Sequence, residues 1–254
     1  LIELGAGNGE MMKIIIESFQ NFPSFLECCN FVIFEKSPTL IKIQKKKLGK
    51  NKIVWISEIK KIKKNPAIFI GNEFFDAIPI KQFKRKKGIW FENYVNLENF
   101  DKAFFFEKEI NIKDIEKKID FKISQNQNFI ECSELGLNYL RNICNIIKKN
   151  TGGLLLIDYG YTEKKMKNTL QAISNHKFAN ILEEIGNVDI THNINFDLYK
   201  KFTKKIGGLD VDITTQKNFL NNMGIKHRAE IISKNQNFFK KADIYYRLKR
   251  LIDE

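Results

Sequence analysis

The stretch LIELGAGNGEMM (Leu1–Met12) decides the fold, because it joins a short apolar strand directly to a glycine loop and a helix start. Glycines at positions 5, 7 and 9 allow the backbone to turn tightly and to approach a ligand closely. The helix expected from Glu10 begins directly after this loop, so its free N–H groups point towards any ligand bound there. Taken alone, the same pattern also suits a plain strand-to-helix turn that binds nothing.

The spacing of the glycines narrows the choice of ligand. The dinucleotide pattern G-x-G-x-x-G is excluded because the third glycine, Gly9, comes one residue early. A phosphate loop is excluded because no Gly-Lys-Ser/Thr follows. An acid followed by GxGxG is similar instead to the loop of class I S-adenosylmethionine (SAM) methyltransferases. Glu3 would then lie near the cationic methionyl amine, and Glu35, at the end of the next predicted strand, could accept both ribose hydroxyls.

The first 80 residues alternate strand and helix patterns, which predicts a doubly wound α/β fold. The expected helices cover 10–19 and 37–48, the second with a Ser cap and a Pro in its first turn. The expected strands are 1–4, 30–37, 52–59 and a segment that ends at 71–72.

Further along the chain the alternation changes. Residues 80–97 predict two strands around a Lys86–Gly88 turn, and we expect 100–124 to extend that sheet and then become irregular. We expect a helix at 132–149 and a buried strand that delivers Asp158 and Tyr159 at its end. The polar segment 162–209 predicts a loop with short helices, followed by a Thr-capped helix ending at Gly224, a strand or helix at 227–234, and a helical tail.

A second group of polar residues follows the fourth predicted strand, in GNEFFDAIP (Gly71–Pro79). Ligands of open α/β sheets lie beyond the carboxyl ends of the strands, so Asn72, Glu73 and Asp76 are expected near the reacting methyl group. The two carboxylates are equally compatible with acids at a helix N-terminus. Phe74 and Phe75 have the character of core or lid aromatics.

Composition sets wide bounds on function. The chain has 254 residues with a net charge of +13, which suits an anionic partner, although the Lys, Ile, Asn and Phe excess also arises from A/T-rich codon usage. Its four cysteines lack CxxC spacing, so we expect reduced, buried thiols and no metal site. No apolar run approaches the ~20 residues of a membrane span.

These motifs together resemble the MidA family of SAM-dependent methyltransferases, which includes the mitochondrial protein arginine methyltransferase required for respiratory complex I assembly. The resemblance covers essentially the whole chain. The matching stretches are, in order, ELGAGNGEMM, FEKSPTLIKIQKKKL, GNEFFDAIPIKQF, GIWFENYV, GGLLLIDYGY, TLQAISNHKF, TQKNFLNNMGIKHRAE and RLIDE.

The resemblance implies a Rossmann-like class I methyltransferase sheet with an inserted, partly helical lobe. It divides the chain into a SAM-binding core at 1–160 with a strand-rich excursion near 83–125, an inserted lobe at 161–210, and a return to the core with a C-terminal helix at 211–254. It also implies truncation at both ends, so we expect this segment alone to bind SAM weakly or to fold poorly.

The resemblance also implies a set of site residues. Those expected to bind SAM are Glu3, Gly5, Ala6, Gly7, Gly9, Glu35, Ser37 and Asn72. Those expected at the reacting centre are Glu73, Asp76 and Asn72. Those expected on the substrate side are Phe75, Asp158 and Tyr159.

One segment departs from the family pattern. The family usually carries Thr-x-His-Val-Asp-Phe in the inserted lobe, whereas this chain reads Thr191-His-Asn-Ile-Asn-Phe196. Asn193 occupies the His position and Asn195 the Asp position. An acid–base role for that His is therefore not expected here, although the loop could keep a packing role.

The implied activity is methylation of a protein arginine, on a respiratory complex I subunit or a similar protein, in the bacterial cytoplasm or the mitochondrial matrix. Two alternatives remain. An amino-group methyltransferase on RNA or Gln is one, but the Asn/Asp-Pro-Pro-aromatic pattern lacks both prolines here, and the acid at 73 favours a cationic substrate. The other is a SAM-binding assembly factor with little catalysis.

Overall fold

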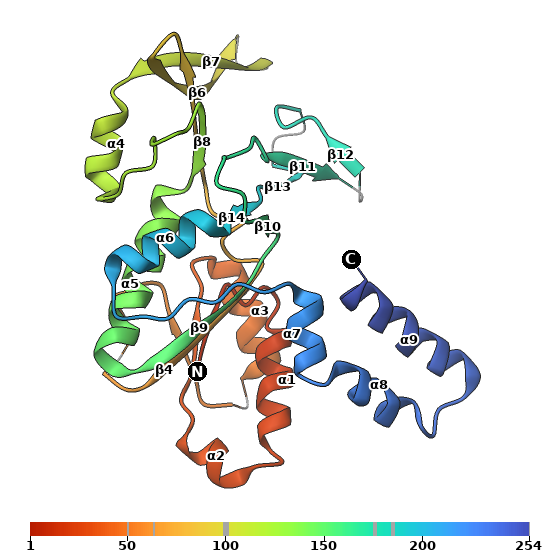
Figure 1. Cartoon of the computed structure of the whole chain (residues 1–254). Helices are drawn as coiled ribbons and strands as arrows, with labels where there is room; N and C mark the ends of the chain where they lie inside the picture. The colour runs from red at the N-terminus through yellow and green to blue at the C-terminus, as the bar shows by residue number, and fades with distance from the viewer. Residues whose placement is uncertain (50, 63, 99–101, 175–176, 184–185, 254) are drawn as a thin grey trace. The chain divides into compact units, whose positions relative to one another are not determined.

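The computed structural model of the chain (Figure 1) divides into two compact units, residues 1–209 and 210–254, which we describe separately. The residues described are 1–49, 51–62, 64–98, 102–174, 177–183 and 186–253.

The first unit is built on a parallel sheet with the strand order β3-β2-β1-β4-β9. This order places β1 at the centre, where the chain reverses the direction in which strands are added. The predicted α/β class is confirmed, and the predicted strands are present with shorter bounds. They are β1 (Ile2–Leu4), β2 (Phe31–Phe34), β3 (Ile53–Ile56), β4 (Ala67–Asn72) and β9 (Gly152–Ile157).

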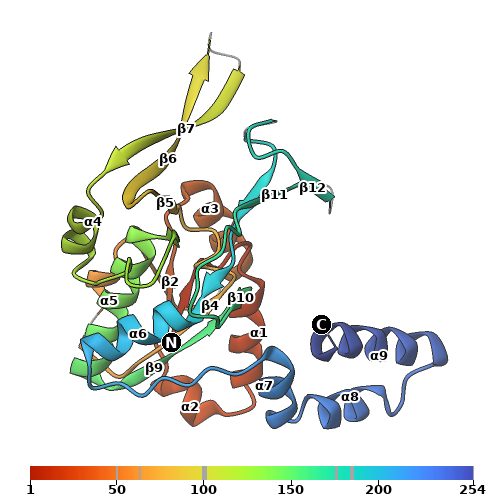
Figure 2. The ribbon, with the colours of Figure 1, turned by 45° about the horizontal axis from the view of Figure 1, so that its top comes forward.

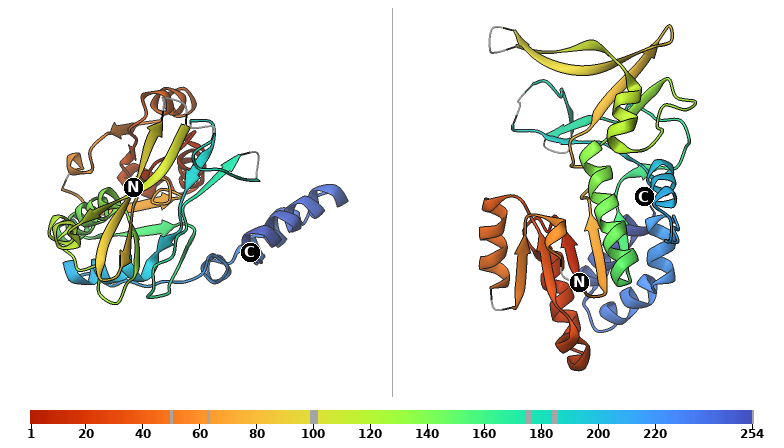
Figure 3. Two further views of the ribbon diagram at one scale, coloured as in Figure 1. Left: turned by 90° about the horizontal axis from the view of Figure 1, so that it is seen from above. Right: turned by 90° about the vertical axis from the view of Figure 1, so that its left-hand side faces the viewer.

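Helices cover both faces of this sheet (Figure 3, right). On one face, Met12 and Leu48 pack with Ile33 of β2. They come from α1 (Glu10–Phe19) and α3 (Pro38–Leu48), while the short α2 (Pro23–Cys28) and the 3-10 turn η1 (Ile59–Lys61) lie in the connections. On the other face, Ile143 of α5 (Glu134–Asn150) joins the same core as Phe69 of β4. Each such fully buried side chain contributes ~1.5–3 kcal/mol relative to an exposed one.

The helix starts follow from local capping. The Ser37 side chain accepts a hydrogen bond from the Leu40 N–H, and Pro38 occupies the first turn, as the sequence predicts. The helix predicted at 132–149 begins later, because Ser133 is its cap and Cys132 is the last residue of β8 (Phe129–Cys132). Cys132 pairs with Lys81 of β5, a long-range contact that outweighs the local helical pattern.

A second, antiparallel sheet has the order β7-β6-β5-β8. The predicted hairpin is confirmed: β5 (Lys81–Lys86) and β6 (Ile89–Glu98) flank Lys87 and Gly88, whose φ angles are 48° and 87°. Two positive φ angles are typical of the tight turns that match strand twist. β6 continues with β7 (Lys102–Ile110) as a ribbon that extends away from the central sheet (Figure 2).

The stretch 100–124 is only partly as predicted. Residues 100 and 101 lie outside the described residues, and β7 extends the sheet as expected. The expected irregular part is wrong, because α4 (Ile112–Ile119) forms there with an Asn111 cap.

Residues 162–209 also contain more strand than predicted. They form a small sheet of order β12-β11-β13, and β14 makes a parallel pair with β10, which lies just before this segment. The expectation of loop and short helices is wrong for these strands and right for α6. The elements are β10 (Gly160–Tyr161), β11 (Gln171–Ser174), β12 (Lys177–Ala179), β13 (Asp189–Thr191), β14 (Ile194–Asn195) and α6 (Phe196–Ile206).

The second unit, 210–254, is helical in its described part. Thr215 caps α7 (Gln216–Asn222), as predicted, and the segment left open between strand and helix is α8 (Ile225–Ser233). The tail is α9 (Phe238–Ile252). The division into a core at 1–160, a lobe at 161–210 and a return at 211–254 stays a prediction.

The four cysteines are free thiols. The expected burial is right for Cys132 and Cys144 and wrong for the other two, because Cys28 is exposed and Cys29 is half-buried. No helix in the described part of the chain has both the length and the apolar character that crossing a bilayer requires.

Candidate functional site

The glycine loop between β1 and α1 depends on left-handed backbone angles. Gly5, Gly7 and Gly9 have φ angles of 64°, 52° and 83°. Such angles are costly for residues with a Cβ, which accounts for glycine at these three positions. The Gly9 N–H donates to the Ala6 carbonyl at 2.7 Å, and the Gly5 N–H donates to Phe34 of β2 at 3.0 Å. The loop is therefore a fixed turn at the carboxyl edge of the sheet.

The three glycines differ in what surrounds them. A Cβ at Gly5 would lie 2.8 Å from the Phe74 ring, and one at Gly9 would lie 3.0 Å from Leu48. Apart from its two chain neighbours, no described residue comes within 4 Å of a Cβ placed at Gly7. The two ends of the loop are thus packed against neighbouring elements, while its middle faces open space.

Glu35 lies directly after β2 and is buried, with an exposed fraction of 8%. Its Oε1 accepts hydrogen bonds from the backbone N–H groups of Lys36 and Ser37 at 2.8 and 2.9 Å. Its Oε2 accepts a hydrogen bond from Gln44 Nε2 at 3.1 Å. These contacts fix the carboxylate. They use both lone pairs of Oε1 and one lone pair of Oε2, so Oε2 keeps one lone pair for a further donor such as a hydroxyl.

Gln44 is a site residue that the sequence reasoning missed. It is fully buried in α3, and its amide links three parts of the site. Nε2 donates to the Gly7 carbonyl at 2.9 Å as well as to Glu35, and Oε1 accepts from the Trp55 indole N–H at 3.0 Å. A glutamine on the inward side of an amphipathic helix is the signal that could have identified it, because buried amides need partners.

Glu3, the second-last residue of β1, is 2% exposed. Burial raises the pKa of its carboxyl to about 7, and a hydrogen bond with the Met12 backbone acts in the opposite direction. Its Oε2 has no hydrogen-bond partner among the described residues. A buried, unpaired carboxylate oxygen at a helix start is the counterpart expected for a cationic ligand group.

These features fit SAM. An ammonium group would satisfy the orphaned oxygen of Glu3, a ribose hydroxyl would use the remaining lone pair of Glu35 Oε2, and the space at Gly7 admits a ligand against the backbone. Ala6 is buried behind the loop, and Ser37 orients Glu35 through its N–H. The assignment of these residues to SAM stays a prediction.

The acidic motif forms a strained turn directly after β4. Asn72 ends the strand and is exposed, and Glu73, also exposed, has a φ angle of 48°. The Glu73 N–H donates to the Ile157 carbonyl of β9 at 2.9 Å. A left-handed angle at a non-glycine residue persists only where neighbours hold it, and such residues cluster at functional sites.

Asp158, just beyond β9, holds this turn from the neighbouring strand. Its Oδ2 accepts a hydrogen bond from the Phe75 N–H at 2.9 Å. Burial, followed by the Asp76 charge, raises the pKa of Asp158 to about 7. Its Oδ1 has no hydrogen-bond partner in the described part of the chain.

Asp76 completes an acidic cluster with Glu73 and Asp158. It is 5% exposed, and burial and then the Glu73 charge raise the pKa of its carboxyl, while His192 acts in the opposite direction. Among the described residues, no lysine or arginine forms an ion pair with any of the three. The cluster therefore favours a cationic ligand over an anionic one.

The aromatic residues of the motif play different parts. Phe75 is fully buried against Tyr199 and reaches the site through its backbone N–H, so its expected place on the substrate side stays a prediction. Phe74 contacts Phe34 and Tyr139 and closes over Gly5, which joins the glycine loop to the acidic turn. Tyr159 is 64% exposed beside the site strand, which leaves its ring free to meet a ligand.

The departing segment 191–196 has a structural role. The His192 N–H donates to the Asp76 carbonyl at 3.2 Å, and its ring Nε2 lies 3.2 Å from the Ile78 carbonyl. Asn195 caps α6 by accepting from the Leu198 N–H at 2.9 Å. The packing role expected for this loop is thus present, with Asn195 as the cap.

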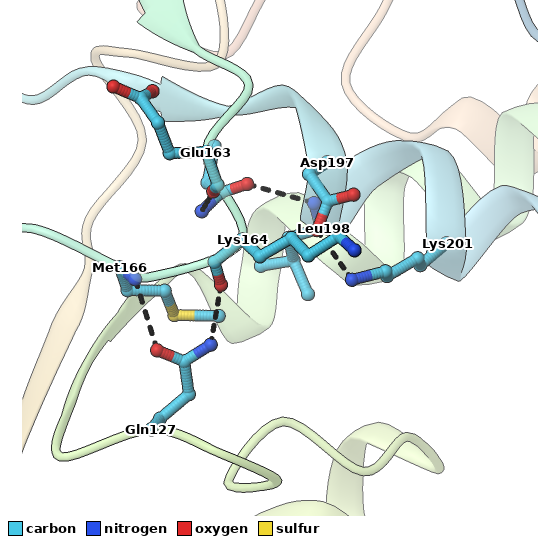
Figure 4. Close-up of polar contacts among 8 residues, drawn as sticks. Gln127, Glu163, Lys164, Met166, Asp197, Leu198 and Lys201 are labelled. Atoms are coloured by element: carbon cyan, nitrogen blue, oxygen red, sulfur yellow. Dashed lines mark hydrogen bonds and ion pairs between the residues drawn. The ribbon is translucent and has the colours of Figure 1, made fainter.

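The segment after β10 is fixed by further contacts (Figure 4). Gln127 donates to the Lys164 carbonyl at 2.7 Å and accepts from the Met166 N–H at 3.0 Å. Within α6, Lys201 pairs with Asp197 at 2.6 Å. The Gln127 bonds hold the segment between β10 and β11, whereas the Lys201–Asp197 pair stabilises α6 itself.

Sequence comparisons give a family and a set of relatives. A family described as "Putative S-adenosyl-L-methionine-dependent methyltransferase" matches residues 1–215. The mitochondrial protein arginine methyltransferase NDUFAF7 homolog of Caenorhabditis elegans is 29% identical over 249 residues, which cover 90% of this chain and 58% of that protein. The mitochondrial protein arginine methyltransferase NDUFAF7 of Danio rerio is 27% identical over 91% of this chain and 60% of its own length. The chain thus spans about three fifths of these relatives.

Among solved structures, a Burkholderia thailandensis protein bound to S-adenosyl-homocysteine superimposes with a TM-score of 0.78. It is 19% identical to this chain, and the alignment covers 100% of this chain and 67% of that one. At this level of identity, the likeness shows a shared fold and nothing further.

Proposed function

This chain belongs to the MidA family of SAM-dependent methyltransferases, and from that premise we propose that it methylates an arginine side chain of a protein. The family resemblance and the Rossmann-like fold expected from the sequence are both confirmed. The observation that carries the arginine proposal is the acidic cluster of Glu73, Asp76 and Asp158, which has no basic partner among the described residues.

The cofactor part of the proposal rests on the glycine loop and its neighbours. Glu35 would bind a ribose hydroxyl through the remaining lone pair of Oε2, and Glu3 would bind the methionyl ammonium through its unpaired Oε2. Gly7 would allow close approach of the ligand to the backbone. When bound, SAM supplies a methyl group activated by its sulfonium.

The acceptor part rests on charge and geometry at the turn after β4. A guanidinium stays protonated in solution, and a carboxylate that binds two of its N–H groups both orients it and concentrates electron density on the reacting nitrogen. Glu73 is exposed and projects from a fixed turn, so we assign this role to it. Asp76, buried beside it, would support the same positive charge.

Orientation accounts for most of what the residues must supply. The reacting nitrogen must come within about 3 Å of the methyl group, in line with the bond that breaks. The proton that the nitrogen loses can leave after transfer, so no strong base is needed. Asp158, whose pKa is raised to about 7 by burial, would receive it near neutral pH.

The last part of the proposal concerns the identity of the acceptor protein. The named relatives are mitochondrial protein arginine methyltransferases. By analogy we propose a complex I subunit or a similar protein as substrate, in a mitochondrial matrix or a bacterial cytoplasm.

Transfer of a labelled methyl group from SAM into a cell lysate tests this function. The lysate is separated into protein and RNA, and the marked residue is identified by mass spectrometry. We expect label on arginine of a protein. Label on RNA would favour the nucleic acid alternative, and partner binding without any label would favour the assembly factor.

A further inference from the structure

A cavity of about 530 Å³ lies between the β6–β7 ribbon and the segment around β11, outside the residues assigned to SAM or to the acidic cluster. One side is made by Asn93, Phe105 and Phe106, and the other by Asn168, Leu170 and Ile181. Both sides belong to the first unit of the chain.

The floor of this cavity is a fixed network of amides and one carboxylate. Gln82, 7% exposed, donates from Nε2 to Glu131 at 2.6 Å and to Asn168 at 2.8 Å, and its Oε1 accepts from Asn93 at 3.1 Å. Glu131, 6% exposed, also accepts from the N–H and the hydroxyl of Thr169. Buried side chains that are fully used by one another form a rigid base.

The two asparagines are bonded at one end only. Asn93 uses its Nδ2, and Asn168 its Oδ1, on Gln82. In the described part of the chain this leaves an amide oxygen on Asn93 and an amide nitrogen on Asn168 without partners. One acceptor and one donor, both lining the cavity and both held by Gln82, match the N–H and C=O groups of a peptide backbone.

The walls and the charge of the cavity support the same kind of ligand. Phe105 is 45% exposed and Phe106 is 38% exposed, and they offer apolar surface to a side chain. Glu107 lines the cavity, Glu131 is bonded to the lining residue Gln82, and Lys86 is already paired with Glu107. None of the described lining residues is basic, so a phosphate backbone is disfavoured.

The cavity is connected to the acidic cluster by short steps along one segment. The Asn193 N–H donates to the Thr169 hydroxyl at 2.9 Å. The neighbouring residue, His192, donates to the Asp76 carbonyl at 3.2 Å. A ligand held on the amide floor is thereby fixed relative to the turn that carries Glu73.

We propose that this cavity is a subsite for the polypeptide that flanks the methylated arginine, and that it binds that chain by its backbone amides and an apolar side chain. The inference rests on the proposed function. It assigns a role in substrate affinity to Asn93, Asn168 and Phe105. These residues are separate from those that we propose to act on the guanidinium.

Steady-state methyl transfer with two acceptors tests the subsite. One acceptor is the protein that the wild-type enzyme marks with labelled SAM, and the other is N-acetyl-arginine methylamide, which lacks flanking residues. Phe105→Ser and Asn168→Ala should each raise KM for the protein by roughly tenfold, with kcat and the SAM affinity unchanged. Transfer to the small acceptor should stay at the wild-type rate. Phe25→Ser, an exposed phenylalanine of α2, is the matched control and should alter neither.

The possible failures are distinguishable. Unchanged KM for the protein, or an equal loss with both acceptors, would overturn the subsite while leaving the proposed function intact. If the wild-type enzyme labels no protein although SAM binding is confirmed, the proposed function fails and the subsite falls with it. Thermal unfolding of each variant shows whether folding is preserved. Phe105→Ser should unfold at the wild-type temperature because that residue is 45% exposed, and Asn168→Ala slightly lower because one Nε2 hydrogen of the buried Gln82 loses its partner.

Discussion

The Asp158 carboxylate accepts a hydrogen bond from the Phe75 N–H at 2.9 Å, although the two residues are 83 positions apart in the chain. Asp158 follows β9 and Phe75 follows β4, and these strands are neighbours in the sheet. The contact ties the turn that presents Glu73 to the next strand. It makes Asp158 a positioning residue for the acidic motif.

Removal of this contact should reduce turnover more than cofactor binding. Asp158→Ala leaves the Phe75 N–H unpaired and frees the turn, so we expect kcat to fall by roughly a hundredfold, because small misplacements are costly at a reacting centre. The SAM affinity, measured by calorimetry, should change little. Asp158→Asn keeps an acceptor oxygen and should restore most of kcat, with a raised KM for the cationic acceptor. Equal kcat in Asp158→Ala and the wild type would contradict the role.

Stability should fall as pH rises towards neutrality. The pKa values of Glu3 and Asp158 are both raised to about 7, so the folded state holds these protons at pH values where the unfolded chain has released them. Between about pH 4.5 and 7 the native state therefore binds more protons, and stability decreases by roughly 1–3 kcal/mol per group. Below this window the penalty is absent.

Urea unfolding at pH 4.5, 6 and 8 measures this dependence. Glu3→Gln and Asp158→Asn should each flatten part of the slope, and the double variant most of it. As a control, Glu183→Gln, an exposed carboxylate, should leave the slope unchanged. A wild-type stability that rises across this window would be incompatible with the raised pKa values.

Gly7 should be more important for cofactor binding than for folding. Its φ angle is 52° and its surroundings are open, so Gly7→Ala should cost ~1–2 kcal/mol of stability, the usual penalty of a left-handed residue. The added methyl group would occupy the space assigned to SAM, and Kd should rise by at least roughly tenfold. Gly88→Ala is a matched control, because Gly88 also has a positive φ angle and open surroundings but lies in the β5–β6 turn. The same SAM affinity in both variants would remove Gly7 from the site.

Gln44 should couple the glycine loop to Glu35. Gln44→Leu preserves the size of the side chain but removes its bonds to Gly7, Glu35 and Trp55. We expect a loss of ~1–3 kcal/mol in stability, because buried polar groups are left unpaired, and a clear rise in the SAM Kd. Gln20→Leu, at an exposed glutamine after α1, should have neither effect. Wild-type affinity in Gln44→Leu would show that Glu35 needs no such support.

The sequence predicted those parts of the fold that depend on local chemistry. The Ser37 cap, the Lys87–Gly88 turn and the glycine loop each have a signature within a few residues, and all three are present. Strands β13 and β14 were missed because their pairing, Ala172 with Ile190 and Tyr161 with Asn195, is set by contacts between residues that are well separated in the chain. The same reason hid β8 behind the helical pattern that begins at Cys132.

The candidate site shows the same division. Glu35 and Glu73 could be located from the sequence because each follows a predicted strand. In an open α/β sheet the carboxyl ends of the strands face the ligand. The role of Gln44 could not be predicted, since its three partners come from three separate elements. The positive φ angle of Glu73 and its support by Asp158 also depend on neighbouring strands, and they appear only in the folded structure.

The central claim is that Glu73 orients a protein arginine for methyl transfer, and transfer by Glu73→Gln tests it most directly. Labelled SAM at a saturating concentration, with cofactor binding confirmed by calorimetry, is incubated with the protein acceptor, and methyl-arginine is quantified by mass spectrometry. We predict that the wild-type enzyme methylates arginine. Glu73→Gln should bind SAM normally but lose most turnover, because a neutral amide has only one acceptor oxygen and cannot accept the paired hydrogen bonds that a carboxylate accepts from a guanidinium. Equal turnover in the variant, or label on a residue other than arginine, would contradict the account.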